Sequence, residues 1–186
     1  RLDQEELRRH FPLPRVLDGL FSLAERLYGI RVKEVPARQS LSGIPAGESA
    51  GTVEVWHPDV RFFTIDDGNG NQLGSFYLDL FSRSNKRAGA WMNTLDTGSP
   101  STPETPGKPR LGMVCLNIHP PAAGDTVTLS HREVRTLFHE FGHLLHLMFT
   151  RVSIPSLAGT SVPRDFVEVP SQFMENWCWR PDVLKS

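Results

Sequence analysis

The sequence has few cysteines, no long apolar run and no excess of one charge. Two cysteines, Cys115 and Cys178, are too few for the disulfide framework of a small secreted domain, and they form no Cys-x-x-Cys pair. They favour a reducing compartment, and we expect the cytoplasm. No stretch approaches the roughly 20 apolar residues that span a bilayer, and the first residues lack the apolar core of a signal peptide. We therefore expect no membrane partner.

The charges of the chain nearly cancel. Twenty basic residues oppose twenty-one acidic ones, which gives a net charge of -1. Such a balance provides no overall field to attract nucleic acid or anionic lipid, so we expect no nucleic-acid partner. With 186 residues, 39% of them apolar, the chain can bury the core of one globular domain.

Helical spacing of apolar residues predicts one or two helices over residues 1–35, closed by Gly29. Residues 61–65 and 73–80 flank the turn-forming Asp67-Gly68-Asn69-Gly70, which predicts a hairpin. Residues 111–118 form a further apolar strand, and we expect it to offer an exposed edge to a peptide backbone.

The stretch from Thr97 to Arg110 holds four prolines and two glycines, which predicts a flexible surface loop. Ser130 and Glu133 match a capping box, so a helix is expected from there to about Phe149. A last helix is expected from Asp165, as N-cap, to Trp177, with a distortion at Pro170.

The main chemical signal is His139-Glu140-Phe141-Gly142-His143 within the capped helix. Four residues place both imidazoles on one helix face, one turn apart, where they can bind one metal ion. Zinc accepts imidazole nitrogen and carboxylate oxygen, and a catalytic zinc keeps three protein ligands and one open position. Taken alone, the motif is as compatible with a structural helix whose histidines are solvated as with a metal site. The capping box, the aromatic neighbours and a downstream glutamate favour the metal site.

A third ligand is needed outside this motif. In one zinc-peptidase arrangement it is a histidine six residues past the second one, with a glycine between, but here those positions are Phe149 and His146. That arrangement is excluded. The alternative is a glutamate on a later helix, and Glu168 follows His143 by 25 residues. We expect Glu168 to be the third ligand.

Three further side chains can be assigned from helical geometry. Glu140 points about 100° away from His139, so we expect it beside a water on the metal, as the general base. His146 lies on nearly the same face as His139, and we interpret it as a polar residue of the cleft rather than a ligand. Glu175 could accept a hydrogen bond from the second ring nitrogen of a ligand histidine, or it could be a solvent-exposed glutamate.

These motifs resemble the thimet oligopeptidase and oligopeptidase A family of zinc metallopeptidases. The resemblance covers most of the chain, and the segments that carry it are 74–81, 86–92, 138–143, 159–160, 165–172 and 172–177. It implies zinc held by His139, His143 and Glu168, and Glu140 as the catalytic glutamate. It also implies that Glu175 contacts a metal ligand without itself binding the metal. The substrates would be short peptides bound in a deep channel.

The resemblance further implies an α+β, zincin-like catalytic core. It should contain the HExxH helix, a second helix bearing a glutamate and a small, mainly antiparallel sheet. The family normally adds a long helical N-terminal half and a downstream region rich in histidine and tyrosine, neither of which is recognisable here. We expect residues 1–186 to be a core segment of a larger enzyme, with self-association through apolar faces that those regions would cover.

The expected function is zinc-dependent hydrolysis of peptide bonds in short oligopeptides, with Glu140 as the base that activates water. The alternative is a non-catalytic zinc- or peptide-binding fragment that lacks the downstream substrate-binding residues. Chelator-sensitive peptide cleavage distinguishes the two.

Overall fold

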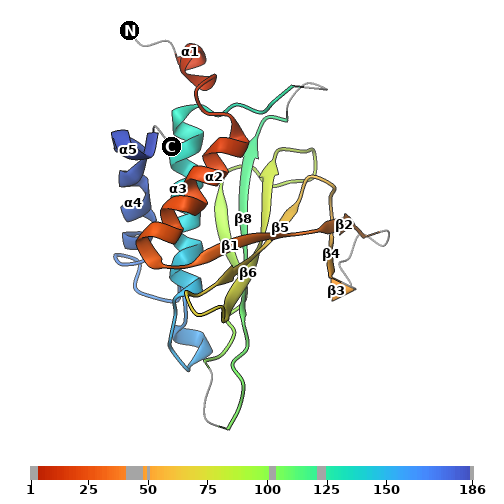
Figure 1. Cartoon of the computed structure of the whole chain (residues 1–186), viewed down its shortest axis with the longest axis vertical. Helices are drawn as coiled ribbons and strands as arrows, with labels where there is room; N and C mark the ends of the chain where they lie inside the picture. The colour runs from red at the N-terminus through yellow and green to blue at the C-terminus, as the bar shows by residue number, and fades with distance from the viewer. Residues whose placement is uncertain (1–3, 41–47, 50, 101–103, 121–124, 185–186) are drawn as a thin grey trace.

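The computed structural model describes residues 4–40, 48–49, 51–100, 104–120 and 125–184. Helices cover one face of a five-stranded sheet, and a second, three-stranded sheet lies against the other face (Figure 1). The predicted mixture of helix and sheet is confirmed. None of the helices in the described ranges is long and apolar enough to cross a membrane.

The five-stranded sheet has the order β1-β5-β6-β8-β7. Its strands are β1 (Arg31–Val35), β5 (Arg61–Asp66), β6 (Gln72–Phe81), β7 (Trp91–Asp96) and β8 (Arg110–Ile118). β6 and β8 run parallel, and the other three pairs are antiparallel. The predicted hairpin is confirmed as β5 and β6. Its turn is held by the Asp67 carboxylate, which accepts hydrogen bonds from the backbone N–H groups of Asn69 and Asn71.

The strand predicted at 111–118 is confirmed as β8, but its predicted place at a sheet edge is wrong. β8 lies between β6 and β7, so its backbone groups are engaged on both sides. The strand next to it, β7, forms that edge of the sheet. Periodicity could not reveal this order, because pairing brings together segments that are distant in sequence.

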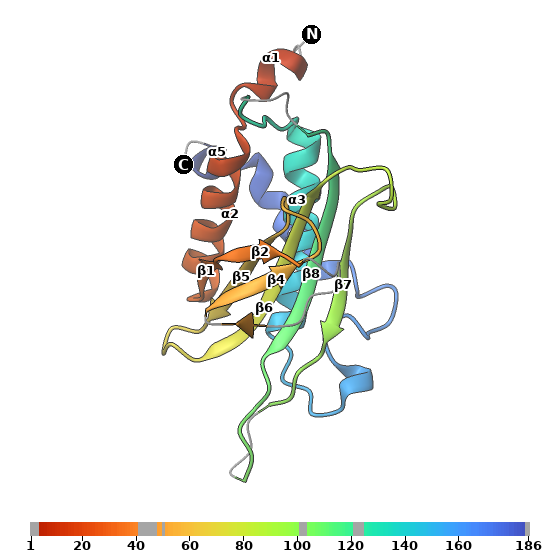
Figure 2. The ribbon, with the colours of Figure 1, turned by 90° about the vertical axis from the view of Figure 1, so that its right-hand side faces the viewer.

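A small sheet with the order β2-β4-β3 covers the face of the main sheet that lies away from the helices (Figure 2). Its strands are β2 (Ala37–Gln39), β3 (Glu48–Ser49) and β4 (Thr52–Val55). Val53 and Val55 of β4 pack against Phe62 and Tyr77 of the main sheet to form a separate apolar cluster.

The predicted N-terminal helices are α1 (Gln4–Arg8) and α2 (Leu13–Tyr28), and α2 is closed by Gly29 in the left-handed conformation, with φ of 67°. The capped helix is α3 (His131–Met148), and the predicted capping box is present: Glu133 N–H donates to Ser130 Oγ, and the Glu133 carboxylate accepts from Ser130 N–H.

The predicted last helix is wrong at its start. Residues 165–168 form turns, and α4 (Val169–Glu175) begins only after Glu168. Pro170 explains the difference: inside a helix starting at Asp165 it would lack the N–H needed for an interior hydrogen bond, whereas in the first turn of α4 no such bond is required. The chain continues through η2 (Asn176–Trp179) to α5 (Pro181–Leu184), and η1 (Pro155–Leu157) lies upstream.

The loop predicted at 97–110 is largely irregular where it is described, with Ser99 and Lys108 joined by an isolated β-bridge. Residues 101–103 of this prediction lie outside the described ranges.

The main core fills the space between the sheet and helices α2 and α3. Its centre is aromatic: the ring of Phe21 from α2 lies 5.2 Å from that of Phe63 and 5.8 Å from that of Phe141 on α3, and the ring of Phe76 stacks on that of Phe63. This packing fixes α3 against the sheet.

The buried carboxylate of Asp79, on β6, binds side chains of the loop that leads into β7. Asp79 is 2% exposed, and it accepts two hydrogen bonds from Arg83, one from Lys86 and one from the Trp56 indole N–H. The Lys86 ammonium also donates to the backbone carbonyls of Phe81 and Leu116. The buried charge is therefore paired and hydrogen-bonded, as a buried charge must be.

Cys115 and Cys178 are both buried, free thiols.

Candidate metal centre and active site

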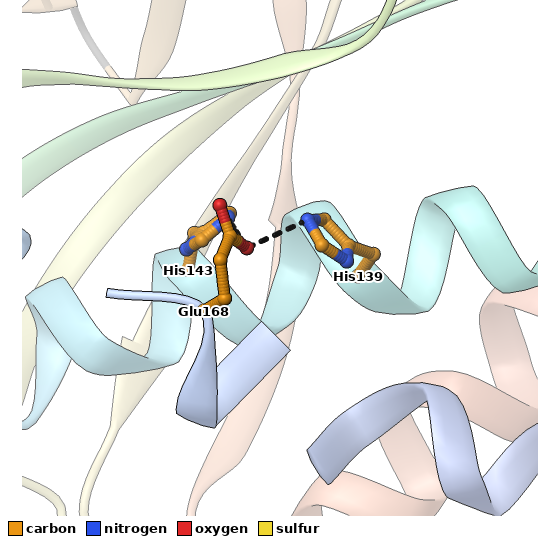
Figure 3. A group of neighbouring side chains, drawn as sticks. All are labelled: His139, His143 and Glu168. Atoms are coloured by element: carbon orange, nitrogen blue, oxygen red, sulfur yellow. Dashed lines mark ion pairs between the residues drawn. The ribbon is translucent and has the colours of Figure 1, made fainter. Parts of the chain in front are cut away.

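Three side chains that could bind a metal ion come together between α3 and the start of α4. One donor atom each from His139, His143 and Glu168 lies within 4.8 Å of the other two (Figure 3). Glu168 Oε2 is 3.2 Å from Nε2 of His139 and 3.2 Å from Nε2 of His143. The helical spacing of four residues aligns the histidines, and the chain reversal after α3 brings Glu168 over them.

The spacing and the charge states of these groups both fit zinc. Tetrahedral zinc with bonds of about 2.0–2.1 Å places its ligand atoms roughly 3.3 Å apart, close to the two distances of 3.2 Å found here. Burial lowers the pKa of His143, which favours the neutral imidazole that a metal requires. The hydrogen bond that Ser171 Oγ donates to Glu168 Oε2, at 2.7 Å, lowers the pKa of Glu168 and favours its carboxylate.

Glu140 lies beside this cluster without belonging to it. It is only 7% exposed, and burial raises its pKa, with a smaller raising contribution from the charge of Glu168. The positive charge that His139 can carry and a hydrogen bond from the Met92 backbone N–H act in the opposite direction. Through Met92 the carboxylate of Glu140 reaches from α3 to β7, the edge strand.

Glu175, the last residue of α4, contacts His139 from the side opposite the cluster. Its Oε1 lies 2.6 Å from His139 Nδ1, and its Oε2 lies 3.3 Å from Nε of Arg135. Of the two interpretations that the sequence allowed, hydrogen bonding to a histidine of the cluster is the one that the structure supports. Arg135 and the Met92 backbone were missed, because the pairing partners of an exposed arginine and of a strand backbone leave no pattern in the sequence.

His146 does not join the donor cluster found within the described ranges. It is half-buried, its ring lies 6.2 Å from that of Phe166, and burial lowers its pKa. Its Nδ1, like that of His143, is buried and has no protein partner among the described residues. His146 thus lies outside the donor cluster and beside Phe166, and its role as a polar residue of a cleft stays a prediction.

The site depends on a close approach of α3 and α4. A Cβ atom on Gly142 would lie 2.6 Å from the Pro170 carbonyl oxygen and 2.6 Å from Ser171 Cα. Since Glu168 lies immediately before Val169 and Pro170, this contact sets the distance between Glu168 and the histidines. A glycine in the third non-ligand position of the motif is thus explained by helix packing.

Comparisons with known proteins show the family to which the chain belongs. The profile described as Peptidase family M3 matches residues 1–186. The chain is 45% identical to oligopeptidase A of Escherichia coli over 184 residues, which are 98% of the chain and 25% of that protein. It is 43% identical to the organellar oligopeptidase A of Arabidopsis thaliana over 190 residues, which are 100% of the chain and 22% of that protein.

A third relative, the dipeptidyl carboxypeptidase of Escherichia coli, is 40% identical over 184 residues, which are 98% of the chain and 24% of that protein. The chain thus spans about a quarter of the length of the curated relatives it matches.

Proposed function

Because the chain belongs to peptidase family M3, we propose that it forms the zinc-binding, zincin-like core of an oligopeptidase that hydrolyses peptide bonds in short peptides. The observation that carries this proposal is the convergence of His139, His143 and Glu168 beside the buried Glu140. The names of its relatives, oligopeptidase A and dipeptidyl carboxypeptidase, support peptides as substrates.

His139 and His143 would hold zinc through Nε2, and Glu168 through its carboxylate. Three protein ligands leave the fourth position of a tetrahedral site open. When bound there, zinc would supply a Lewis acid that polarises the peptide carbonyl and makes water easier to deprotonate.

Glu140 would act as the general base. Its carboxylate sits next to the donor cluster, and burial raises its pKa, so it is a stronger base than an exposed glutamate. It takes a proton from the attacking water and can then give that proton to the leaving amine.

The edge strand β7 would hold the substrate in an extended conformation. An unpaired strand edge offers backbone donors and acceptors to any extended peptide, whatever its side chains. β7 meets this need because it ends the sheet next to β8 and contacts Glu140 through Met92. A peptide paired with this edge would carry its backbone toward the general base.

We place the protein in the cytoplasm, because both cysteines are free thiols inside the fold.

Three apolar side chains on or just before α4 are each about half exposed: Phe166 at 50%, Val169 at 50% and Phe173 at 48%. We propose that the isolated chain self-associates through them, which size-exclusion chromatography over a range of concentrations tests.

Cleavage of a quenched fluorescent peptide by the purified, zinc-loaded chain tests the proposed activity. The expected result is cleavage that o-phenanthroline stops, that added zinc restores, and that Glu140→Gln abolishes. Zinc binding without cleavage would support the alternative, a non-catalytic zinc- or peptide-binding fragment. Cleavage that persists in the chelator and in Glu140→Gln would contradict the proposed mechanism.

A further inference from the structure

Arg135 lies one helical turn before His139 on α3 and shares with it a single partner on α4. Its Nε is 3.3 Å from Glu175 Oε2, while His139 Nδ1 is 2.6 Å from Glu175 Oε1. Each carboxylate oxygen therefore has its own partner, and both partners come from one face of α3. The order of contacts is Arg135, Glu175, His139 and then, 3.2 Å from His139 Nε2, Glu168.

We propose that Arg135 is a positioning residue for the metal site, acting through Glu175 on His139. This inference rests on the proposed zinc site. A neutral imidazole carries one N–H, and a carboxylate 2.6 Å from Nδ1 holds that proton on Nδ1. Nε2 then presents its lone pair toward His143 and Glu168, which is the tautomer that a metal ligand needs.

Glu175 can act in this way only if its carboxylate keeps one orientation. It is the last residue of α4 and its side chain is 25% exposed, so one hydrogen bond alone leaves rotation about the carboxyl group open. The guanidinium of Arg135 forms an ion pair with the other oxygen, at 3.3 Å, and so favours one orientation of the carboxylate.

The fold does not need this ion pair. Arg135 is 48% exposed, and exposed ion pairs contribute little to stability. The loss of Arg135 should therefore change the metal site without unfolding the protein. Loss of a group that directly supports a ligand reduces metal affinity by about 10- to 100-fold, so removing a group one contact further out should reduce it by about 3- to 10-fold.

The test compares Arg135→Ala and Arg135→Lys with the parent and with Arg132→Ala, which removes an exposed arginine three residues earlier on the same helix. Zinc affinity is measured by competition with a chromophoric chelator. The tautomer of the His139 ring is measured from its imidazole nitrogen shifts in the metal-free protein, assigned with His139→Asn, at a pH where those shifts show the ring to be neutral. Thermal unfolding verifies that each variant is folded.

We expect Arg135→Ala to reduce zinc affinity by about 3- to 10-fold and to raise the fraction of His139 with its proton on Nε2. Arg135→Lys should lie between it and the parent, and Arg132→Ala should match the parent. A His139 tautomer and a zinc affinity that are both the same in Arg135→Ala and the parent would overturn the proposal. If the parent binds no zinc, the proposed function fails, and the tautomer measurement still decides the role of Arg135.

Discussion

Replacing Gly142 by alanine should damage the metal site more than the fold. The added Cβ would lie 2.6 Å from the Pro170 carbonyl oxygen and from Ser171 Cα, and ordinary contacts begin at 3.4 Å. Both atoms belong to the backbone of α4, so no side chain can rotate away. The helix must move by about 1 Å to restore van der Waals contact.

The effect on stability is the difference between two opposing terms. Overpacking costs about 1–3 kcal/mol, whereas alanine in place of glycine favours the helix by about 1 kcal/mol. The net destabilisation is therefore about 0–2 kcal/mol. The effect on zinc is larger, because Glu168 moves with α4 and a displacement of about 1 Å far exceeds the roughly 0.2 Å that zinc–ligand distances tolerate. Zinc affinity should fall by on the order of 100-fold.

Urea unfolding and chelator competition on the same preparations measure the two effects. Gly19→Ala is the matched control, because Gly19 is a helical glycine of α2, which carries none of the three candidate metal ligands, and alanine favours a helix there as it does at position 142. This control should bind zinc like the parent and unfold at an equal or higher urea concentration. A Gly142→Ala protein with the zinc affinity of the parent would refute the argument that the contact between α3 and α4 sets the ligand spacing.

The remaining predictions concern the base, a ligand and the buried carboxylate. Glu140→Gln should keep bound zinc and lose peptide cleavage, whereas His143→Ala should lose both; equal zinc loss in the two variants, measured by atomic spectroscopy, would contradict their separate roles. Burial alone would raise the pKa of Asp79, but the hydrogen bonds and charges of Arg83 and Lys86 outweigh it and lower that pKa. Its contribution to stability is therefore complete well above the unfolded pKa of about 4, falls as the pH drops below that value, and is lost once the pH has passed through the lowered folded pKa. Asp79→Asn should lower the free energy of unfolding at pH 7 by about 3–5 kcal/mol. Below about pH 4, its free energy of unfolding in urea should depend less on pH than that of the parent. If the two proteins show the same dependence on pH, Asp79 does not have this role.

Local signals in the sequence predicted much of the fold. The capping box at Ser130 located α3, Gly29 located the end of α2, and the turn residues from Asp67 located the β5–β6 hairpin, because each of these features is made by neighbouring residues. The edge position of β7 and the interior position of β8 depend on pairing between distant segments, which no local pattern encodes. The start of α4 was misplaced because Asp165 resembles an N-cap, although Pro170 requires a later beginning.

The same distinction between local patterns and distant contacts applies to the candidate site. The spacing of His139 and His143 follows from helix geometry, so their convergence was predictable, and the sequence singled out Glu168 and Glu175 as candidates to join them. Arg135 could not be found in this way, since its importance lies in one contact across two helices rather than in a motif.

The zinc content of the purified chain is a direct test of the proposed metal site. After dialysis against metal-free buffer, atomic spectroscopy of the parent and of His143→Ala, related to protein concentration, gives the number of zinc ions per chain. We expect about one zinc in the parent and none in the variant. No zinc in a folded parent, or equal zinc in both proteins, would contradict the assignment of His139, His143 and Glu168 as the ligands.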